Sequence, residues 1–104
     1  MTRGEIWWAD LEQPIGRRPV VLLSRPEAYG LLTAVVAAEV TTRPRRAPTH
    51  VALGRRDGVD RPSAANLDAL HTVPVGRLSL RMSVLSAKRM AEIDEALRFA
   101  LSLD

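Results

Sequence analysis

The side chains best suited to chemistry lie at the ends of two apolar runs. Arg18 stands directly before the run Pro19–Ser24, and Thr41 directly follows the run Leu31–Val40. Because Pro19 fixes its own φ, Arg18 projects from a stiff strand entrance. A rigid guanidinium can stabilise the charge that develops on a phosphate during transfer, and a hydroxyl can bond a phosphate oxygen. Each residue alone is also ordinary, as an exposed arginine beside a strand or a threonine at a strand end.

The cations of this chain are nearly all arginine. Fourteen of the fifteen basic residues are arginine, and Lys88 is the only lysine, in a chain of net charge +3. Six arginines fall between Arg43 and Arg61, against only Asp57 and Asp60 in the same stretch. Arginine grips phosphate with two donors and stacks on bases, so this local patch predicts nucleic-acid binding. A compositional bias of the genome is the alternative explanation for the arginine content.

Length and composition narrow the class of protein. The 104 residues predict one domain, covering 1–104, with a modest core. With no cysteine, disulfide scaffolds and zinc–thiolate sites are excluded, and a cytoplasmic location is expected. No apolar run approaches the ~20 residues that span a membrane, and the start lacks a signal-peptide pattern. We expect no cofactor and no metal, since Asp57 and Asp60 alone would hold Mg²⁺ poorly.

The two histidines support a simple hypothesis from chemistry alone. RNA cleavage by the neighbouring 2′-hydroxyl needs a base for its proton and an acid for the leaving 5′-oxygen. His50 and His71 are the only side chains that ordinarily titrate near neutrality. A ribonuclease with two catalytic histidines is therefore one possibility, and two solvent-facing strand residues are the other.

The elements that must position these residues are mainly strands. Strands are expected at 5–11, 19–24, 31–40, 50–53 and 64–73, with the last also readable as a helix by pattern. Trp7 and Trp8 should point to opposite faces of the first strand. Apolar residues then recur at three- and four-residue steps, which predicts a helix over about 87–101 with Ser86 as its N-cap. Lys88 and Arg89 in its first turn oppose the helix dipole. These elements predict a mainly β fold, a small β-barrel with a C-terminal helix packed on it.

Several short motifs, in order along nearly the whole chain, carry a resemblance. From Arg3 to about Leu101 the sequence resembles the MazF/PemK family of toxins from type II toxin–antitoxin systems. Each piece alone is weak, but their order and spacing make the match specific. The pieces are Arg3-Gly4-Glu5-Ile6-Trp7, Asp10-Leu11, Arg18-Pro19-Val20-Val21, Val40-Thr41, Pro48-Thr49-His50-Val51, Asn66-Leu67-Asp68, Thr72-Val73 and Met90-Ala91-Glu92-Ile93-Asp94-Glu95-Ala96-Leu97.

The resemblance implies a metal-independent, sequence-specific endoribonuclease on an SH3-like barrel, as in MazF, PemK and CcdB. It implies products with 2′,3′-cyclic phosphate and 5′-hydroxyl ends, so that translation and growth stop. The family's catalytic arginine and threonine match Arg18, which would stabilise the transition state, and Thr41, which would position the phosphate. His50 then becomes a structural or RNA-contacting residue, and we prefer this reading to the two-histidine hypothesis.

The implied partners are single-stranded RNA, a second copy of the chain and an antitoxin with an acidic C-terminal tail, with no membrane. The expected RNA-binding residues are Arg3, Arg17, Ser24, Thr42, Arg43, Arg45, Arg46, His50 and Asp68. Two departures from the family affect recognition. The loop over 12–17 looks shorter than in many relatives, and the segment after Asp68 differs from their glutamine-containing one, so the recognised RNA sequence does not follow.

Two other classes of protein fit parts of the pattern. A CcdB-like toxin shares the barrel but binds DNA gyrase and cuts nothing. The chain ends in Ser102-Leu103-Asp104, without the distinctive aromatic tip that would favour this class. A noncatalytic RNA-binding SH3-like module would bind RNA without needing Arg18.

Overall fold

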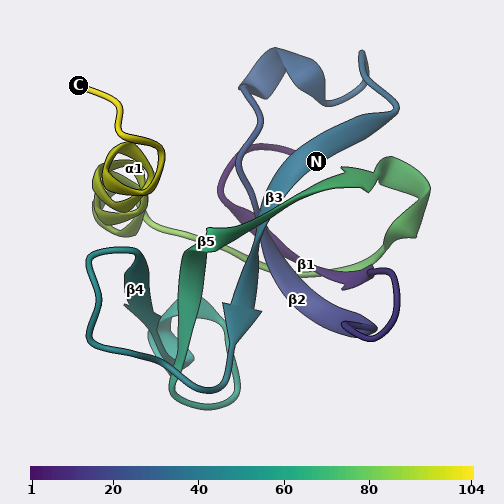
Figure 1. Ribbon diagram of the computed structural model, residues 1–104. Helices are drawn as coiled ribbons and strands as arrows, with labels where there is room; N and C mark the ends of the chain where they lie inside the picture. Colours follow the sequence, from purple (N-terminus) through teal and green to yellow (C-terminus); the bar gives the residue numbers. More distant parts are fainter.

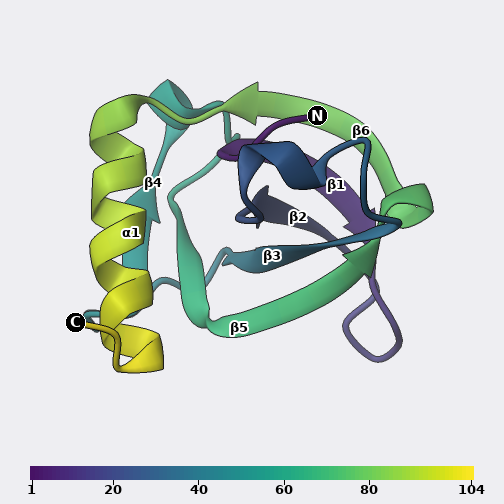
Figure 2. The same ribbon diagram turned by 90° about the horizontal axis from the view of Figure 1, so that it is seen from above.

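Six antiparallel strands and one α-helix form the computed structural model, which describes residues 1–104. The strands pair in the order β4-β5-β3-β2-β1-β6, so β4 and β6 lie at the two edges. Figures 1 and 2 show this sheet curled on itself, with the helix beside β4 and β5. The elements are β1 (Glu5–Asp10), β2 (Arg17–Leu22), β3 (Ala34–Thr41), β4 (His50–Leu53), β5 (Ser63–Pro74), β6 (Leu78–Val84) and α1 (Ala87–Leu101).

The curl divides the core into two apolar clusters. The larger has thirteen buried residues and includes Ile6, Val21 and, from α1, Ile93. The smaller has eight, with Val20 and Leu22 of β2 among them. Neighbouring residues of β2 thus enter different clusters, which is why this strand reads as a continuous apolar run. Such burial holds β2 rigid between its neighbours β1 and β3.

A buried carboxylate fixes the start of β1. Glu5 accepts hydrogen bonds from Trp7 Nε1, the Thr2 amide and Arg81 Nε, each within 3.0 Å. Burial by itself would raise the pKa of Glu5, but these hydrogen bonds outweigh it and hold the pKa below its ordinary value. The carboxylate therefore ties β1 to the edge strand β6.

The predicted fold class is confirmed, and one strand went unpredicted. The sequence indicated five strands, whereas the structure has six, because β6 was not assigned. Its residues Leu78, Leu80, Met82 and Val84 alternate with polar ones, which is a strand pattern. Strand β3 also begins at Ala34 rather than at Leu31, since a 3₁₀ turn at Pro26–Ala28 and the following residues precede it.

The ambiguous segment proves to be a strand with an interruption. In the pairing of β5 with β3, Leu70 lies opposite Ala38 but Asn66 lies opposite Glu39. Residues 67–69 are therefore bulged out of the ladder, directly after the segment of β5 that pairs with β4. The buried side chain of Leu67 anchors the bulge in the core, and Asp68 is left exposed.

The C-terminal helix agrees with its expected bounds. Ser86 caps it, since its hydroxyl oxygen accepts a hydrogen bond from the Arg89 amide at 3.1 Å. The helix is neither long enough nor apolar enough to cross a membrane.

Candidate active site

A cleft of about 690 Å³ opens where the ends of β2 and β3 meet the loop that leads into β5. We call it the main cleft. Its charged residues are four arginines and one aspartate, so the cleft is strongly basic and suits an anionic ligand. Its lining comprises Trp8, Arg17, Arg18, Pro19, Val40, Thr41, Thr42, Arg43, Val59, Asp60, Arg61, Ser63 and Met82.

The strand register explains why Arg18 and Thr41 share the main cleft. Val20 of β2 is paired with Glu39 of β3 in an antiparallel ladder. If this register is continued by two residues, back along β2 and forward along β3, Arg18 lies opposite Thr41. Both are then on the same face of the sheet as Val20 and Glu39. The ladder itself ends at the Val20–Glu39 pair, and both side chains line the cleft beyond that point. An arginine and a hydroxyl are thus presented together at the base of a basic cleft.

A second basic residue is stacked at the edge of this cleft. The guanidinium carbon of Arg17 lies 4.8 Å from the ring centroid of Trp8, a cation–π arrangement. Trp8 faces the cleft, whereas Trp7 packs against the smaller core cluster, as their adjacent positions on β1 require.

The loop over 42–49, which we call the Arg43 loop, extends the main cleft into a side hollow of about 300 Å³. Thr41 and Arg43 line both cavities, which makes them parts of one groove. The side hollow is lined by Thr41, Arg43, Arg45, His50, Asn66 and Asp68. Two backbone amides of this loop are bonded to side chains: Arg43 N donates to Thr41 Oγ1 at 3.1 Å and Arg45 N donates to His50 Nδ1 at 3.2 Å. Otherwise its arginines are exposed.

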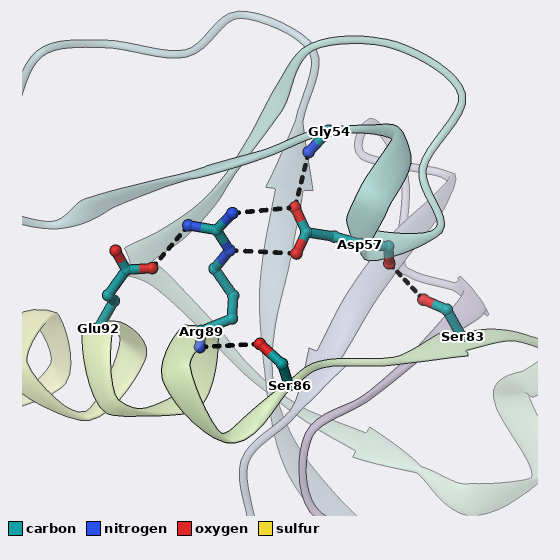
Figure 3. A network of polar contacts seen from close by, with 6 residues as sticks. All are labelled: Gly54, Asp57, Ser83, Ser86, Arg89 and Glu92. Carbon is teal, nitrogen blue, oxygen red and sulfur yellow. Dashed lines mark hydrogen bonds and ion pairs between the residues drawn. The ribbon is translucent and has the colours of Figure 1, made fainter.

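The opposite wall of the main cleft is the loop over 54–62, which we call the Asp57 loop. Figure 3 shows how it is fixed: both carboxylate oxygens of Asp57 accept hydrogen bonds from Arg89, at 3.1 and 3.4 Å, and one also accepts from Gly54 N at 2.9 Å. Ser83 Oγ of β6 donates to the Asp57 carbonyl at 2.6 Å. Glu92 pairs with the remaining side of Arg89 at 2.6 Å. The loop is thereby joined to both the helix and an edge strand.

This network gives Asp57 and Arg89 roles that differ from those expected from the sequence. Asp57 is buried and paired with Arg89, whereas Asp60 is exposed and lines the main cleft. Arg89 was expected to oppose the helix dipole, but its two carboxylate partners compensate that charge. They also raise the pKa of Arg89, the hydrogen bonding of its guanidinium to the Asp57 carboxylate being the largest cause.

The structure gathers most of the expected site residues and leaves a few outside. Arg17, Arg18, Thr41, Thr42, Arg43, Arg45, His50 and Asp68 line the groove. Arg46 is exposed on the Arg43 loop but lines neither cavity.

Two expected RNA-binding residues are engaged elsewhere. Arg3 donates to the Leu23 carbonyl at 3.0 Å and to the carboxylate of Asp94, in the middle of α1, at 2.6 Å. The Ser24 hydroxyl oxygen accepts from Val36 N at 2.8 Å. A role for them in RNA binding remains a prediction.

The two histidines do not share a cavity. His50 lines the side hollow, and its ring nitrogen Nδ1 accepts a hydrogen bond from Arg45 N of the Arg43 loop. His71 lines a separate hollow beside residues 10–15 and bonds Glu39. This arrangement gives no support to an acid–base pair made of these two residues.

Sequence reasoning missed one residue with contacts to the candidate site. Glu39 is the only charged residue within β3, and its carboxylate contacts Arg18. A lone carboxylate two residues before Thr41, in an otherwise apolar strand, was the signal that could have found it.

Comparison with known proteins identifies the family. Residues 2–101 match the family model described as PemK-like, MazF-like toxin of type II toxin-antitoxin system. The chain belongs to this family. It is 41% identical over 100 residues to the probable endoribonuclease MazF5 of Mycobacterium tuberculosis, covering 95% of this chain and 91% of the relative.

Solved structures of toxins in this family match the whole fold. The M. tuberculosis toxin MazF-mt6 superposes with a TM-score of 0.89 at 32% identity, over 96% of this chain and 98% of that one. An endoribonuclease in complex with its cognate antitoxin, from a mycobacterial species, gives a TM-score of 0.89 at 27% identity, over 100% of this chain and 97% of that one. The predicted MazF/PemK-like family and fold are therefore confirmed.

Proposed function

We propose that this chain is the toxin of a type II toxin–antitoxin pair and acts as an endoribonuclease on single-stranded RNA. The observation that carries the proposal is the joint presentation of Arg18 and Thr41, from adjacent strands, in a cleft with four arginines. The names of its relatives support the same activity, since MazF5 and EndoA of Bacillus subtilis are both called endoribonucleases.

The chemistry we propose needs no metal ion. The 2′-hydroxyl of the RNA gives up its proton and attacks the adjacent phosphorus, the bond to the 5′-oxygen breaks, and that oxygen takes up a proton, so that no proton is gained or lost overall. The products are a 2′,3′-cyclic phosphate and a 5′-hydroxyl. Arg18 stabilises the negative charge that builds on the phosphate oxygens, and Thr41 holds the phosphate through its hydroxyl. Arginines of the groove, among them Arg43 and Arg45, bind the neighbouring phosphates and stack on bases.

The partners belong to the same proposal. An antitoxin with an acidic tail complements a groove lined by arginines, and a solved relative is described as a complex with its cognate antitoxin. A second copy of the chain would cover apolar surface on the open sheet edge, where Leu80 and Val84 of β6 are exposed. A cytoplasmic place of action follows from the RNA substrate.

The test compares two arginines that each precede a proline at opposite ends of the same apolar run. We expect Arg18→Ala to lower the cleavage rate of end-labelled RNA in EDTA by at least about 10²–10³-fold. Arg25→Ala is the matched control, because Arg25 also precedes a proline but is exposed and lines neither part of the groove. It should cut at the wild-type rate.

Three measurements make the outcome decisive. The unfolding temperature shows that both variants fold, end-group analysis identifies the products, and a supercoiling assay tests inhibition of DNA gyrase. If the wild-type protein cuts no RNA, or if folded Arg18→Ala cuts as fast as wild type, the proposed function is wrong.

A further inference from the structure

The carboxylate of Glu39 lies beneath the candidate catalytic arginine and has two partners. Oε1 accepts a hydrogen bond from Arg18 Nη1 at 2.9 Å, and Oε2 is bonded to His71 Nε2 at 2.5 Å. A carboxylate only accepts, so the imidazole donates in the second bond. Only 13% of the Glu39 side chain is exposed, against 37% for Arg18 and 26% for His71. Glu39, the most buried of the three side chains, thus bonds Arg18 through one carboxylate oxygen and His71 through the other.

Strand geometry fixes which part of Arg18 is held. Glu39 is paired with Val20, so Arg18 is its diagonal neighbour on the same face of the sheet. Only Nη1 of Arg18 is bonded within the protein, which leaves Nε and Nη2 for a ligand in the main cleft. An arginine side chain is otherwise free to sample many rotamers, and fixing it in one costs conformational entropy. Glu39 removes much of that freedom before a phosphate arrives.

A purely structural role explains Glu39 poorly. Its neighbours Ala38 and Val40 are buried and apolar, and β3 carries no other charge. Replacing all the charged members of such a buried ion pair by well-packed apolar residues is often neutral or stabilising. A negative charge beside a basic cleft also weakens attraction for RNA. The residue that best serves folding and RNA attraction at this position would therefore be apolar, and Glu39 calls for another explanation.

We propose that Glu39 is a positioning residue for Arg18, itself held from the far side by His71. This inference rests on the proposed function. The ion pair sets the guanidinium opposite Thr41, so that its free donors meet the phosphate as charge develops there. His71 neutralises part of the carboxylate's charge when protonated and fixes the orientation of the carboxylate in either case.

The test separates positioning from folding with two substitutions. Glu39→Val keeps a strand-forming apolar residue, and Glu39→Gln keeps an oxygen that can accept from Arg18. We expect Glu39→Val to lower kcat by about 10- to 100-fold, with KM for RNA within about threefold of wild type. Its unfolding temperature should change little, because Arg18 and His71 are partly exposed and water can solvate them once the carboxylate is gone. Glu39→Gln should recover most of kcat, because one hydrogen bond to Arg18 survives.

A double variant checks that Glu39 acts through Arg18. In the Arg18→Ala background, Glu39→Val should cause no further loss of kcat, because there is no guanidinium left to orient. Glu5→Gln is the matched control: Glu5 is a similarly buried carboxylate paired with an arginine, Arg81, that lies outside the main cleft. It should lower the unfolding temperature and leave kcat unchanged.

The outcomes distinguish this inference from the proposed function. If Arg18→Ala abolishes cleavage but Glu39→Val cuts at the wild-type rate, Glu39 does not position Arg18, while the ribonuclease assignment stands. A faster Glu39→Val enzyme would mean that the ion pair restrains Arg18, which also overturns the inference. Full additivity in the double variant would show that Glu39 acts independently of Arg18. If no variant and no wild-type protein cuts RNA, the proposed function itself fails.

Discussion

The two loops that flank the candidate groove are alike in sequence and unlike in attachment. Each carries three arginines, with two prolines in the Arg43 loop and one in the Asp57 loop. The Asp57 loop is joined to α1 through the buried Asp57 carboxylate and to β6 through the Asp57 carbonyl. The Arg43 loop is bonded instead to the strands beside it, through the side chains of Thr41, His50 and Asp68. Arginine content therefore does not determine how rigid a basic loop is. One well-placed aspartate does, because it connects the loop to elements far along the chain.

The difference suggests separate tasks for the two loops. A fixed wall preserves the shape of the cleft around Arg18 and Thr41. A loosely held loop with exposed cations can adjust to an extended RNA, at the entropic cost of ordering when RNA binds. Four substitution or digestion experiments test this contrast, beginning with the largest expected effect.

Removing the carboxylate of the Asp57 loop should have the largest effect on stability. Asp57→Ala leaves Arg89 without its main partner and Gly54 N without an acceptor, and we expect a loss of about 3 kcal/mol in the free energy of unfolding. Urea unfolding measures it. Glu92→Ala is the control, because it removes the other, 44% exposed partner of Arg89 and should cost under about 1 kcal/mol. Equal losses in the two variants would contradict the anchoring role of Asp57.

The close approach of the Asp57 loop to β6 can be tested at Gly58. This residue has φ of +86°, and a Cβ there would lie 2.3 Å from Ser83 Cβ. We expect Gly58→Ala to cost about 2 kcal/mol through backbone strain and the clash. Gly76→Ala, where a Cβ meets open space, should change thermal stability by less than about 0.5 kcal/mol. A neutral Gly58→Ala would show that the loop is free to move away from β6.

The Arg43 loop should affect RNA binding and leave folding unchanged. Arg45→Ala with Arg46→Ala should weaken binding about tenfold and reduce the slope of log K against log salt by one to two. The unfolding temperature should not change, because both side chains are exposed. Arg55→Ala with Arg56→Ala is the matched control, since that exposed pair lines neither part of the groove. An unchanged salt slope in the first pair would exclude it from the interface.

Limited digestion detects the smallest expected effect, which is the difference between the two loops in the free energy of local opening. Trypsin should cut the native protein first after Arg45 or Arg46, because little structure must open there. Cuts after Arg55 or Arg56 should come later, and Asp57→Ala should bring them forward. Intact mass of the first fragments identifies the site. A first cut within the Asp57 loop of the wild-type protein would reverse the comparison.

Much of this fold could be predicted from sequence, because β2 and α1 carry strong local signals. A continuous apolar run marks β2, and a three- and four-residue period marks α1. Strand β6 was missed although Leu78, Leu80, Met82 and Val84 alternate with polar residues. Leu78 is buried in the core, but Leu80 and Val84 are exposed at the sheet edge. The alternation therefore does not correspond to one buried face, which weakens it as a strand signal.

The candidate site was predictable in its residues more than in their contacts. Arg18 and Thr41 were found from residue type and family resemblance, and the register shows why they meet. The partners of Glu39 and Asp57 were not predictable, because each interaction joins residues 21 to 32 positions apart. Such pairs depend on strand register and helix placement, which local patterns do not encode.

The bulge in β5 bears on how RNA preference can change during evolution. Residues 67–69 have no partner in β3, and Asp68 is held on its outer side by the Thr49 hydroxyl at 2.7 Å. Substitutions at Asp68 or Ala69 therefore leave the strand ladders intact, provided that Leu67 remains in the core. Under the function proposed above, a lineage can vary this end of the groove, and with it the bases that fit there, while the barrel and the pair Arg18 and Thr41 stay as they are.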